Sequence, residues 1–520
     1  MNWSAAWLRG AAGVVAACGV LAAVPVSAGA QRPKIDPALK SAAHAGSGTV
    51  RVIIRGKAGD LRTAAIPVAH LDALANDPSV DHLSFDAPVR SSARAEMSEA
   101  DRAQESVLLA TLGLQGRSLT GRGVGVAVLD SGVQPDSTLK PAAFLDFTTD
   151  NSVARAYDDF GHGTHVSGLI AGRHDGVAPG VRLISVKVLN GRGEGLTSTV
   201  IAAIDHLIAQ RTTLGVDVIN LSLGHPITES AGDDPLVHAV ERASRAGIVV
   251  VVAAGNLGRE QNASITSPGN APSAITVGSL DTGATAARAD DAVNTYSSRG
   301  PSAYDGIVKP DVVAPGHQLV SNAAVGSLLF ETYPERRVTD ASGLARFRLS
   351  GTSMATGVTS GVVALMLEQH RRESALPLSI NMIKAMLQYT ALPLPGVDQL
   401  AQGAGSLNAA GAIELVRALE DSAAGIDTLA LASVNPTTTI GGEAYVWNQT
   451  VVWGHTVVWG HGLFEDVNAW ANTVVWGHTV VWGHTVVWGH TVVWGHTVVW
   501  GHTVVWGHTV VWGHTYTVPE

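Results

Sequence analysis

The sequence predicts an α/β protein in which a parallel sheet is flanked by helices on both faces. Four runs rich in β-branched residues read as strands: 124–129, 216–223, 248–253 and 274–277. Two clear helical stretches lie among them: 199–210 and 234–246. The run over 247–253 is continuously apolar, which is typical of a strand buried on both faces. Alternation of this kind implies a parallel sheet, with functional residues gathered beyond the carboxyl ends of its strands.

Length and composition exclude several classes of protein. The chain has 520 residues, with 34 Lys and Arg against 44 Asp and Glu, and a formal net charge of −10. Its length allows two to four domains with well-buried cores. A chain that is 46% hydrophobic and 15% charged is neither disordered overall nor a basic nucleic-acid binder. A single cysteine excludes a disulfide framework and a Cys-rich zinc site.

Residues 1–30 are predicted to be an export signal. The segment carries one charge, Arg9, followed by an apolar run that ends in Ala28-Gly29-Ala30, a small-x-small site for signal peptidase. Two alternatives stay open: a membrane-spanning helix, and a lipoprotein signal cleaved before Cys18. Cleavage after Ala30 leaves a mature chain without cysteine, and we expect a secreted or extracellular protein.

A small α/β unit is predicted over residues 31–95. Residues 49–54 alternate as a strand, 70–75 suit a short helix, and 80–85 suit a second strand. The unit holds nine Lys and Arg against six Asp and Glu, so it can dock on the acidic remainder of the chain. Residues 91–106 are small and polar, as in an exposed linker open to proteolysis.

Three segments of the main domain carry residues that suit chemistry. In GVGVAVLDSGV, residues 123–133, a strand ends at Asp130, which taken alone also suits a turn cap. In DFGHGTHVSG, residues 159–168, His162 precedes a helix of small residues, and His165 is expected to be structural. No HExxH accompanies these histidines, so no metal site is predicted.

The third segment is LSGTSMATG, residues 349–357. Ser353 has small neighbours and precedes an apolar helix. A serine at a loop-to-helix junction is often only an N-cap. The same place also offers a nucleophile the helix dipole and a free backbone N–H.

The order Asp130, His162, Ser353 is that of a subtilisin triad. Residues 31–420 resemble a subtilase, a subtilisin-like serine protease with an N-terminal propeptide. Three further motifs are similar to the family's substrate-binding strand, oxyanion segment and specificity-pocket loop: Val218–Gly224 (VINLSLG), Ala253–Asn256 (AAGN) and Ser267–Ser273 (SPGNAPS). The resemblance implies a subtilisin-like fold and a serine endopeptidase acting on proteins and peptides.

The resemblance also implies residue roles. His162 would be the general base for Ser353, and Asp130 would orient the imidazole. The Asn256 side chain and the Ser353 backbone N–H would form the oxyanion hole. Substrate binding is expected at four residues: Ser222, Leu223, Gly224 and Thr266. No cofactor is required for this chemistry. A structural calcium ion is compatible with the family, but residues 173–179 lack the longer calcium-binding loop of several relatives, and no specific site is predicted.

The family propeptide implies a folding aid and inhibitor, removed by the enzyme itself through a cut within residues 91–110. The predicted domains are a signal peptide, a propeptide, a protease domain and a repeat tail: 1–30, 31–95, 96–425 and 426–520.

The tail contains the hexapeptide TVVWGH nine times without a change, at 450–461 and 473–514. Because the period of six residues is even, the same side chains face the same side of an extended strand in every copy. The repeat therefore suits a β-rich stack or solenoid. An array of hairpins fits less well, since no Asn-Gly turn occurs in the repeat. A poorly ordered appendage is the alternative. The tail has no Lys or Arg, which argues against nucleic acid. Contact with a cell wall or polysaccharide, and metal collection by the histidines, stay open.

Two functions therefore follow from the sequence. The first is a secreted, autoprocessed serine endopeptidase. The alternative is a cell-surface structural or adhesive repeat protein whose protease domain serves mainly its own maturation.

Overall fold

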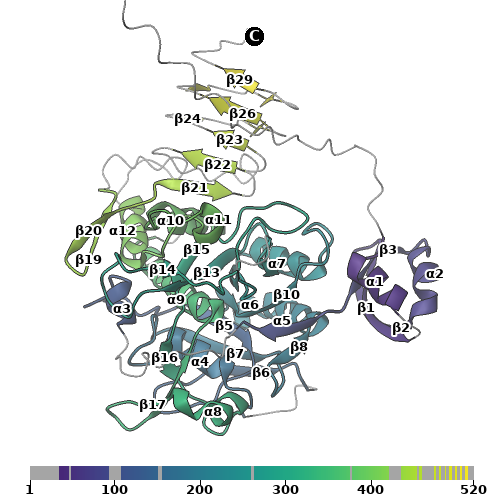
Figure 1. The fold of residues 1–520 in the computed structure, drawn as a ribbon, viewed down its shortest axis with the longest axis horizontal. Coiled ribbons are helices and arrows are strands. Elements are labelled where there is room, and N and C mark those ends of the chain that lie inside the picture. Colours follow the sequence, from purple (N-terminus) through teal and green to yellow (C-terminus); the bar gives the residue numbers. More distant parts are fainter. Residues whose placement is uncertain are drawn as a thin grey trace, which may run out of the picture. The chain divides into compact units, whose positions relative to one another are not determined.

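The structure is a computed structural model that describes eight ranges of the chain and short strands of the repeat (Figure 1). The ranges are 34–45, 48–92, 107–116, 118–149, 155–258, 263–374, 378–420 and 435–453, and the further repeat strands lie between 456 and 512. The predicted export signal and most of the predicted linker lie outside the described residues.

The central element is an eight-stranded sheet with the order β14-β13-β11-β9-β5-β7-β6, in which β15 also pairs with β13. All of its pairs are parallel except that of β13 with β14. The strands are β5 (Gly125–Asp130), β6 (Ala143–Asp146), β7 (Arg182–Lys187), β9 (Val218–Leu221), β11 (Val249–Ala253), β13 (Ile275–Asp281), β14 (Ala292–Val293) and β15 (Val312–Pro315). The predicted parallel α/β architecture is confirmed.

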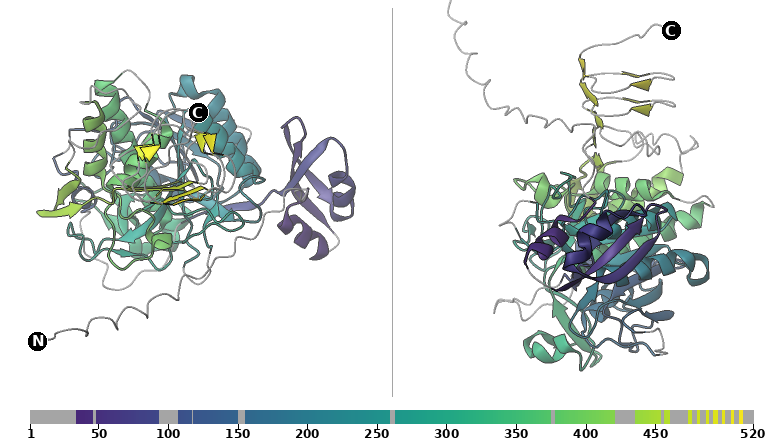
Figure 2. Two further views of the ribbon diagram at one scale, coloured as in Figure 1. Left: turned by 90° about the horizontal axis from the view of Figure 1, so that it is seen from above. Right: turned by 90° about the vertical axis from the view of Figure 1, so that its right-hand side faces the viewer.

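Alternate residues of the central strands face two separate cores. Val126 and Val128 of β5 pack into the core that contains α4 and α9, whereas Ala127 and Leu129 pack into the core that contains α5 and α7. The valines of β11 divide in the same way. Because side chains alternate across a strand, a continuously apolar run supplies both faces of the sheet. The helices around the sheet are visible in Figures 1 and 2.

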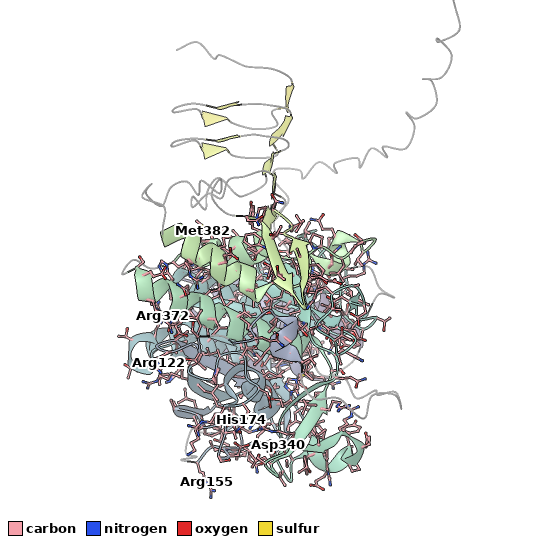
Figure 3. The ribbon with its side chains drawn as sticks, turned by 90° about the vertical axis from the view of Figure 1, so that its left-hand side faces the viewer. Arg122, Arg155, His174, Asp340, Arg372 and Met382 are labelled. Carbon is pink, nitrogen blue, oxygen red and sulfur yellow. The ribbon has the colours of Figure 1, made fainter. Side chains whose placement is uncertain are left out.

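Twelve α-helices and two short 3-10 helices lie within the described ranges. They are α1 (Pro37–Ala45), α2 (Leu71–Ala75), α3 (Leu108–Thr111), α4 (His162–Ala171), α5 (Thr197–Ala209), α6 (Arg211–Leu214), α7 (Pro235–Arg245), α8 (Leu328–Thr332), α9 (Thr352–Glu373), α10 (Ile380–Thr390), α11 (Gln399–Gln402), α12 (Ala409–Glu420), η1 (Val68–His70) and η3 (Pro334–Arg336). The long helix α9 is tied to the loop before β5 because Glu368 accepts hydrogen bonds from the backbone of Thr120 and Gly121 and pairs with Arg372, labelled in Figure 3.

The segment 34–92, called here the N-terminal segment, has its own small core and sheet, with the strand order β2-β1-β3. Its strands are β1 (Thr49–Gly56), β2 (Leu61–Pro67), β3 (Val80–Phe85) and β4 (Pro88–Ser91). The strands predicted at 49–54 and 80–85 and the helix predicted at 70–75 are confirmed.

Strand β4 is not part of the small sheet and lies between two strands of the main domain. It pairs antiparallel with β10 (Leu223–Pro226) on one side and with β8 (Glu194–Leu196) on the other. Strand β12 (Thr266–Ser267) completes this sheet, whose order is β12-β10-β4-β8.

Polar side chains of the N-terminal segment also contact the main domain. The His82 ring lies 2.7 Å from a carboxylate oxygen of Glu229, and both side chains are buried. Arg55 donates to the backbone carbonyl of Asp233 and lies 3.5 Å from its carboxylate. Basic groups of this segment thus meet acidic groups of the main domain, as its charge predicts.

A small antiparallel sheet precedes α9, in the order β16-β18-β17. Its strands are β16 (Leu319–Asn322), β17 (Arg337–Thr339) and β18 (Ala345–Leu349). Strand β18 ends at Leu349, and only Ser350 and Gly351 separate it from α9, whose first turn contains Ser353, so this sheet anchors the start of α9.

Residues 435–449 correct the predicted domain boundary at 425/426. They form the hairpin β19 (Thr437–Ile440) and β20 (Glu443–Val446) and then bury Trp447 in the core with α10 and α12. The indole Nε1–H donates to Thr438 Oγ1 at 2.7 Å, and the ring packs edge-on against Tyr389. The segment therefore belongs structurally to the protease domain, and the repeat begins after it.

The described strands of the repeat pair mainly in parallel, and paired residues are 18 apart in the chain except between β22 and β23, where they are 17 apart. Thr473 pairs with Thr491, Val480 with Val498, and Val486 with Val504. Eighteen residues are three copies of the hexapeptide, so three copies make one layer of the stack that Figure 2 shows. The strands are β21 (Thr450–Trp453), β22 (Thr456–Trp459), β23 (Thr473–Val475), β24 (Val480–Val481), β25 (Val486–Val487), β26 (Thr491–Trp494), β27 (Val498–Val499), β28 (Val504–Val505) and β29 (Val510–Trp512).

The first two copies differ from the rest. Strands β21 and β22 pair antiparallel, with Trp453 opposite Thr456. The sequence argues against an array of hairpins, and this antiparallel pair is an exception among the described repeat strands, whose other pairs are parallel.

Candidate active site

The first part of the candidate site is a buried pair formed by Asp130 and His162. Asp130 is the last residue of β5, and His162 is the first residue of α4. Both are 0% exposed, and His162 Nδ1 lies 2.8 and 2.9 Å from the two carboxylate oxygens of Asp130. Because a carboxylate only accepts, the Nδ1–H is the donor, which leaves Nε2 as the nitrogen able to accept a proton.

Glycine allows the two elements to approach. A Cβ on Gly163 would lie 2.3 Å from the carbonyl oxygen of Gly132, in the turn after β5. Gly161, which precedes His162, has a φ of 102°, a conformation that favours glycine. The glycines around the histidine thus place the imidazole against the carboxylate.

Ser353 lies in the first turn of α9 and is 0% exposed. Its hydroxyl donates to the backbone carbonyl of Ser222 at 3.0 Å. His162 Nε2 is buried and has no hydrogen-bond partner among the described residues. The structure therefore joins Asp130 to His162 and places Ser353 at the same strand ends, with its hydroxyl turned toward Ser222 rather than toward the imidazole.

The amide of Asn256 has a fixed orientation. Its Oδ1 accepts from the backbone N–H and the hydroxyl of Thr352, at 3.0 and 3.1 Å. The amide Nδ2 is thereby directed away from Thr352, and it donates to the carbonyl oxygen of Ser92 at 2.5 Å. The backbone N–H of Ser353 lies 3.4 Å from the same oxygen. The two donors predicted for the oxyanion hole, Asn256 Nδ2 and the Ser353 backbone N–H, thus both point to the carbonyl oxygen of Ser92.

Three of the predicted substrate-binding residues hold the chain that leads to this carbonyl. The backbone N–H of Ser92 donates to Ser222 O at 3.1 Å. Leu223 pairs with Ser91, and Gly224 pairs with Arg90. An extended peptide therefore lies in register along the predicted binding strand.

The fourth predicted residue, Thr266, fills the space between two glycines. A Cβ on Gly224 would lie 2.9 Å from Thr266 Oγ1, and a Cβ on Gly255 would lie 2.7 Å from Thr266 Cγ2. The Thr266 hydroxyl donates a hydrogen bond to Ala254 O at 3.3 Å, and this bond restricts the movement of the side chain. Gly224 lies two residues after Ser222, and Gly255 immediately precedes Asn256; Ser222 and Asn256 both bond the backbone of Ser92.

A buried polar network supports the serine from behind. The Ser222 hydroxyl donates to Ser353 O at 3.0 Å and accepts from Asn220 Nδ2 at 2.9 Å. Ser360, two turns further along α9, donates to Asn220 Oδ1. Strand β9 and helix α9 are thereby held in one relative position near the serine.

The histidine three residues after His162 has a different environment. His165 is fully buried, and its Nε2–H donates to Leu319 O at 2.9 Å, while Nδ1 has no hydrogen-bond partner among the described residues. Burial lowers the pKa of His165 to about 3. It is a neutral structural histidine at ordinary pH, as expected.

Sequence reasoning missed two participants. Ser92 was placed only within a broad range, because nothing in its own sequence distinguishes it from its neighbours. Glu194 and strand β8, which form the second wall beside β4, were not identified at all. The segment GRGEG that contains Glu194 has no recognisable chemical motif.

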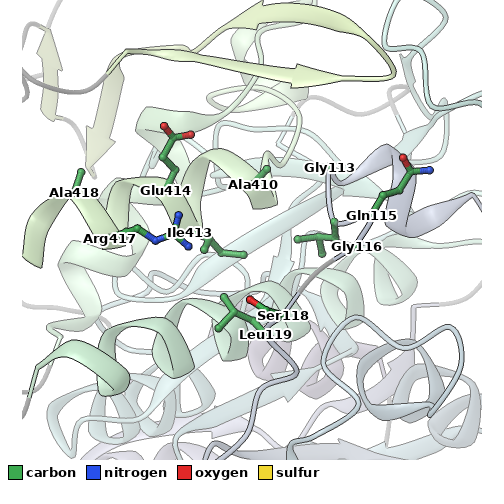
Figure 4. A pocket seen from close by; sticks show the side chains of 11 residues that line it. Gly113, Gln115, Gly116, Ser118, Leu119, Ala410, Ile413, Glu414, Arg417 and Ala418 are labelled. Carbon is green, nitrogen blue, oxygen red and sulfur yellow. The ribbon is translucent and has the colours of Figure 1, made fainter.

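The described cavities lie elsewhere. A pocket of about 470 Å³ is lined by residues of the loop after α3 and by α12, among them Leu114, Glu414 and Arg417 (Figure 4). It contains none of the predicted site residues. Within the described ranges there is no group of three or more His, Cys, Asp or Glu side chains arranged to hold a metal ion.

No helix in the part of the chain that the structure describes is long and apolar enough to span a membrane.

Cleaving a peptide bond with a serine requires a base for the hydroxyl and donors for the carbonyl oxygen, and one sheet edge here holds both kinds of group. Fold and site together define the class of serine proteases. The model of the subtilase family matches residues 121–412, more than half of the chain, and the chain belongs to this family.

Two sequence relatives agree with this assignment. Serine protease AprX of Bacillus subtilis (strain 168) is 38% identical over 325 residues, which cover 60% of this chain and 69% of the relative. Subtilisin DY of Bacillus licheniformis is 33% identical over 303 residues, 57% of this chain and 92% of the relative. A crystal structure of a cold adapted subtilisin-like serine proteinase has a TM-score of 0.42 and 29% identity, covering 56% of this chain and 89% of that one.

Proposed function

We propose that this chain is an exported serine endopeptidase, made as a precursor that cleaves itself between Ser92 and Ala93. The observation that carries the proposal is the position of the Ser92 carbonyl, 2.5 Å from Asn256 Nδ2 and 3.4 Å from the Ser353 backbone N–H. A carbonyl in that position is the one at which an oxyanion would develop.

The first chemical step needs one movement. Ser353 rotates its hydroxyl from Ser222 O toward His162 Nε2, which has no other described partner. His162 takes the hydroxyl proton as Ser353 Oγ bonds to the Ser92 carbonyl carbon, and Asp130 stabilises the imidazolium that forms. The negative charge on the carbonyl oxygen is held by Asn256 Nδ2 and the Ser353 N–H.

The intermediate then collapses. The bond between the Ser92 carbonyl carbon and the Ala93 nitrogen breaks, and His162 returns its proton to that nitrogen. Ser92 remains as an ester on Ser353 Oγ. A water molecule attacks this ester, His162 takes its proton, and the hydroxyl of Ser353 is restored as the Ser92 carboxylate leaves.

The same contacts support an inhibitory role for the N-terminal segment after the cut. Strand β4 remains paired with β10 and β8, and the contacts of Arg55 and His82 with the main domain do not depend on the Ser92–Ala93 bond. In this proposal the segment is a propeptide that blocks the cleft until it is degraded.

The test is processing of the full chain. Ser353→Ala should accumulate as the uncut precursor, while the wild type should yield a product whose new N-terminal residue is Ala93. Ser167→Ala is a matched control, because the Ser167 hydroxyl is buried on α4 without a hydrogen-bond partner among the described residues. Normal processing of Ser353→Ala in a protease-deficient host would contradict self-cleavage, and a different new N-terminus would contradict the position of the cut.

A second candidate function assigns a role to the repeat. The 18-residue register of the repeat supports an ordered appendage, and a cell-surface structural or adhesive protein would use its protease domain mainly for its own maturation. Contact of this appendage with a cell wall or polysaccharide belongs to the same candidate. Labelling of Ser353 by a fluorophosphonate together with hydrolysis of casein supports the endopeptidase, whereas labelling without turnover of any added protein supports the second candidate.

A further inference from the structure

Arg90 is the third residue before the proposed cleavage site. Counting back from the bond between Ser92 and Ala93, Ser92 occupies the first position, Ser91 the second, Arg90 the third and Val89 the fourth. Val89 is 0% exposed and packs with the core that contains α5 and α7, whereas Arg90 is exposed. The side chain at the third position therefore lies at the protein surface, where it can meet a charged partner.

That partner is Glu194. Arg90 Nη2 lies 3.0 Å from Glu194 Oε1, with the two side chains 71% and 42% exposed. The two residues are also opposite each other in the pairing of β4 with β8, so the backbone register brings the side chains together. The contact is thus built into the way a peptide enters the cleft.

Glu194 itself is held in place by a tight loop. Its backbone N–H donates to Asn190 Oδ1 and its backbone carbonyl accepts from the Asn190 N–H, at 3.2 and 2.9 Å. The neighbouring Gly193 carbonyl accepts from the Ser91 N–H. Because the loop and the peptide strand are joined by backbone hydrogen bonds, the backbones of Glu194 and Arg90 are already fixed relative to each other, and only the two side chains lose freedom when the ion pair forms.

We propose that Glu194 makes this protease selective for peptides with Arg or Lys at the third position before the cleaved bond. The inference rests on the proposed function, since it treats Pro88–Ser92 as a peptide bound in the manner of a substrate. An exposed ion pair predicts a modest effect, about two- to fivefold in kcat/KM, that weakens as salt is added.

The experiment uses the processed full-chain enzyme and three peptides, Val-Arg-Ser-Ser, Val-Gln-Ser-Ser and Val-Glu-Ser-Ser, each with a fluorogenic amide after the last serine. The wild type should prefer Arg to Gln about two- to fivefold and Gln to Glu by a similar factor. Glu194→Gln should lose this preference, and Glu194→Lys should reverse it. Asp205→Asn is the matched control: it removes an exposed carboxylate from α5, paired there with Arg242, and should leave the preference unchanged.

The outcomes separate the two proposals. Equal kcat/KM for the three peptides, or a preference that survives in Glu194→Gln, overturns the role of Glu194 while leaving the endopeptidase intact. Absence of hydrolysis of every peptide and of casein, with no labelling of Ser353, overturns both.

Discussion

The amide nitrogen of Asn256 donates to the carbonyl oxygen of Ser92, a residue 164 positions earlier in the chain. Thr352 fixes the other end of the same amide, so the donor is oriented before any charge develops on the carbonyl. Preorganised donors of this kind cost no reorganisation at the moment of reaction, which is why they contribute strongly to catalysis.

Removing this donor should reduce kcat by about 10²–10³, the magnitude established for the corresponding amide of a subtilisin. Both Asn256→Ala and Asn256→Asp should show the loss in a peptide-hydrolysis assay. Asn256→Asp keeps an acceptor for Thr352 and so separates the donor from local folding. An unchanged kcat in either variant, with Ser353 still labelled by a fluorophosphonate, would remove Asn256 from the oxyanion hole.

Thr266 should restrict the first position before the cleaved bond to small residues such as Ser92. Thr266→Gly empties the space between Gly224 and Gly255 and should raise kcat/KM for Phe relative to Ala at this position by about tenfold or more. Thr266→Ser keeps the hydroxyl that bonds Ala254 O and removes only the methyl group, so it should give an intermediate ratio. The hypothesis fails if all three enzymes have the same ratio.

His165 should make the protein sensitive to acid. Its pKa is lowered by burial from the model-peptide value of 6.5 to about 3, so the unfolded chain binds a proton that the folded chain does not. The stability associated with the neutral ring is present above pH 6.5 and is lost as the pH falls toward 3, by about 1.4 kcal/mol per pH unit.

Thermal unfolding between pH 7 and pH 4 checks this expectation. His165→Gln should lower the stability at pH 7 but flatten its decline toward pH 4. His174→Gln, at an exposed position labelled in Figure 3, is the control and should leave the decline unchanged. Equal slopes for the wild type and His165→Gln would show that other groups dominate acid unfolding.

Trp447 should stabilise the protease domain rather than the repeat. Trp447→Phe removes the donor to Thr438 Oγ1 and leaves part of the indole space empty, at a cost of about 3 kcal/mol. Thr438→Val should also destabilise, because Asn408 Nδ2 and Trp447 Nε1 both lose their acceptor. Denaturant unfolding monitored by residual proteolysis measures both effects. Trp453→Phe, within the first repeat copy, is the control that should leave the domain unchanged.

The fold of the repeat should tolerate the insertion of a whole hexapeptide and should be disrupted by the insertion of a single residue. Insertion of one extra TVVWGH after His490 preserves strand parity and lets the 18-residue register continue. One glycine inserted at the same point shifts every following strand by one residue, which moves each side chain to the opposite face. Far-UV circular dichroism and resistance of the tail to an added protease should be retained in the first variant and reduced in the second.

Much of the fold and site was open to prediction because its signals are local. The composition of β11 alone predicts that the strand is buried, since every residue must be apolar when both faces of a strand are covered. Asp130 ends a strand, His162 and Ser353 lie in the first turns of helices, and the order of the three residues along the chain is that of the family. The structure places Asp130 beside His162, and the roles of the two residues stay predictions.

Other features depend on contacts that no local pattern encodes. Trp447 was grouped with the tail because it shares the composition of the repeat, yet it packs against Tyr389 in the main core. The antiparallel pairing of the first two hexapeptides was missed although their sequences are identical to the others. Identical segments can pair differently when their neighbours differ, and only the assembled structure selects between the pairings.

The sequence by itself determined the α/β class, the family and the residues expected to carry the chemistry. The pattern of apolar residues, the order of the motifs and their spacing are all properties of the chain alone. Tertiary structure decided where those residues act. It placed the Ser92 carbonyl at Asn256, turned the Ser353 hydroxyl toward Ser222, and set Glu194 opposite Arg90. Each of these relations joins segments distant in the chain through backbone pairing and burial, and such distances are fixed only when the sheet and its helices pack together.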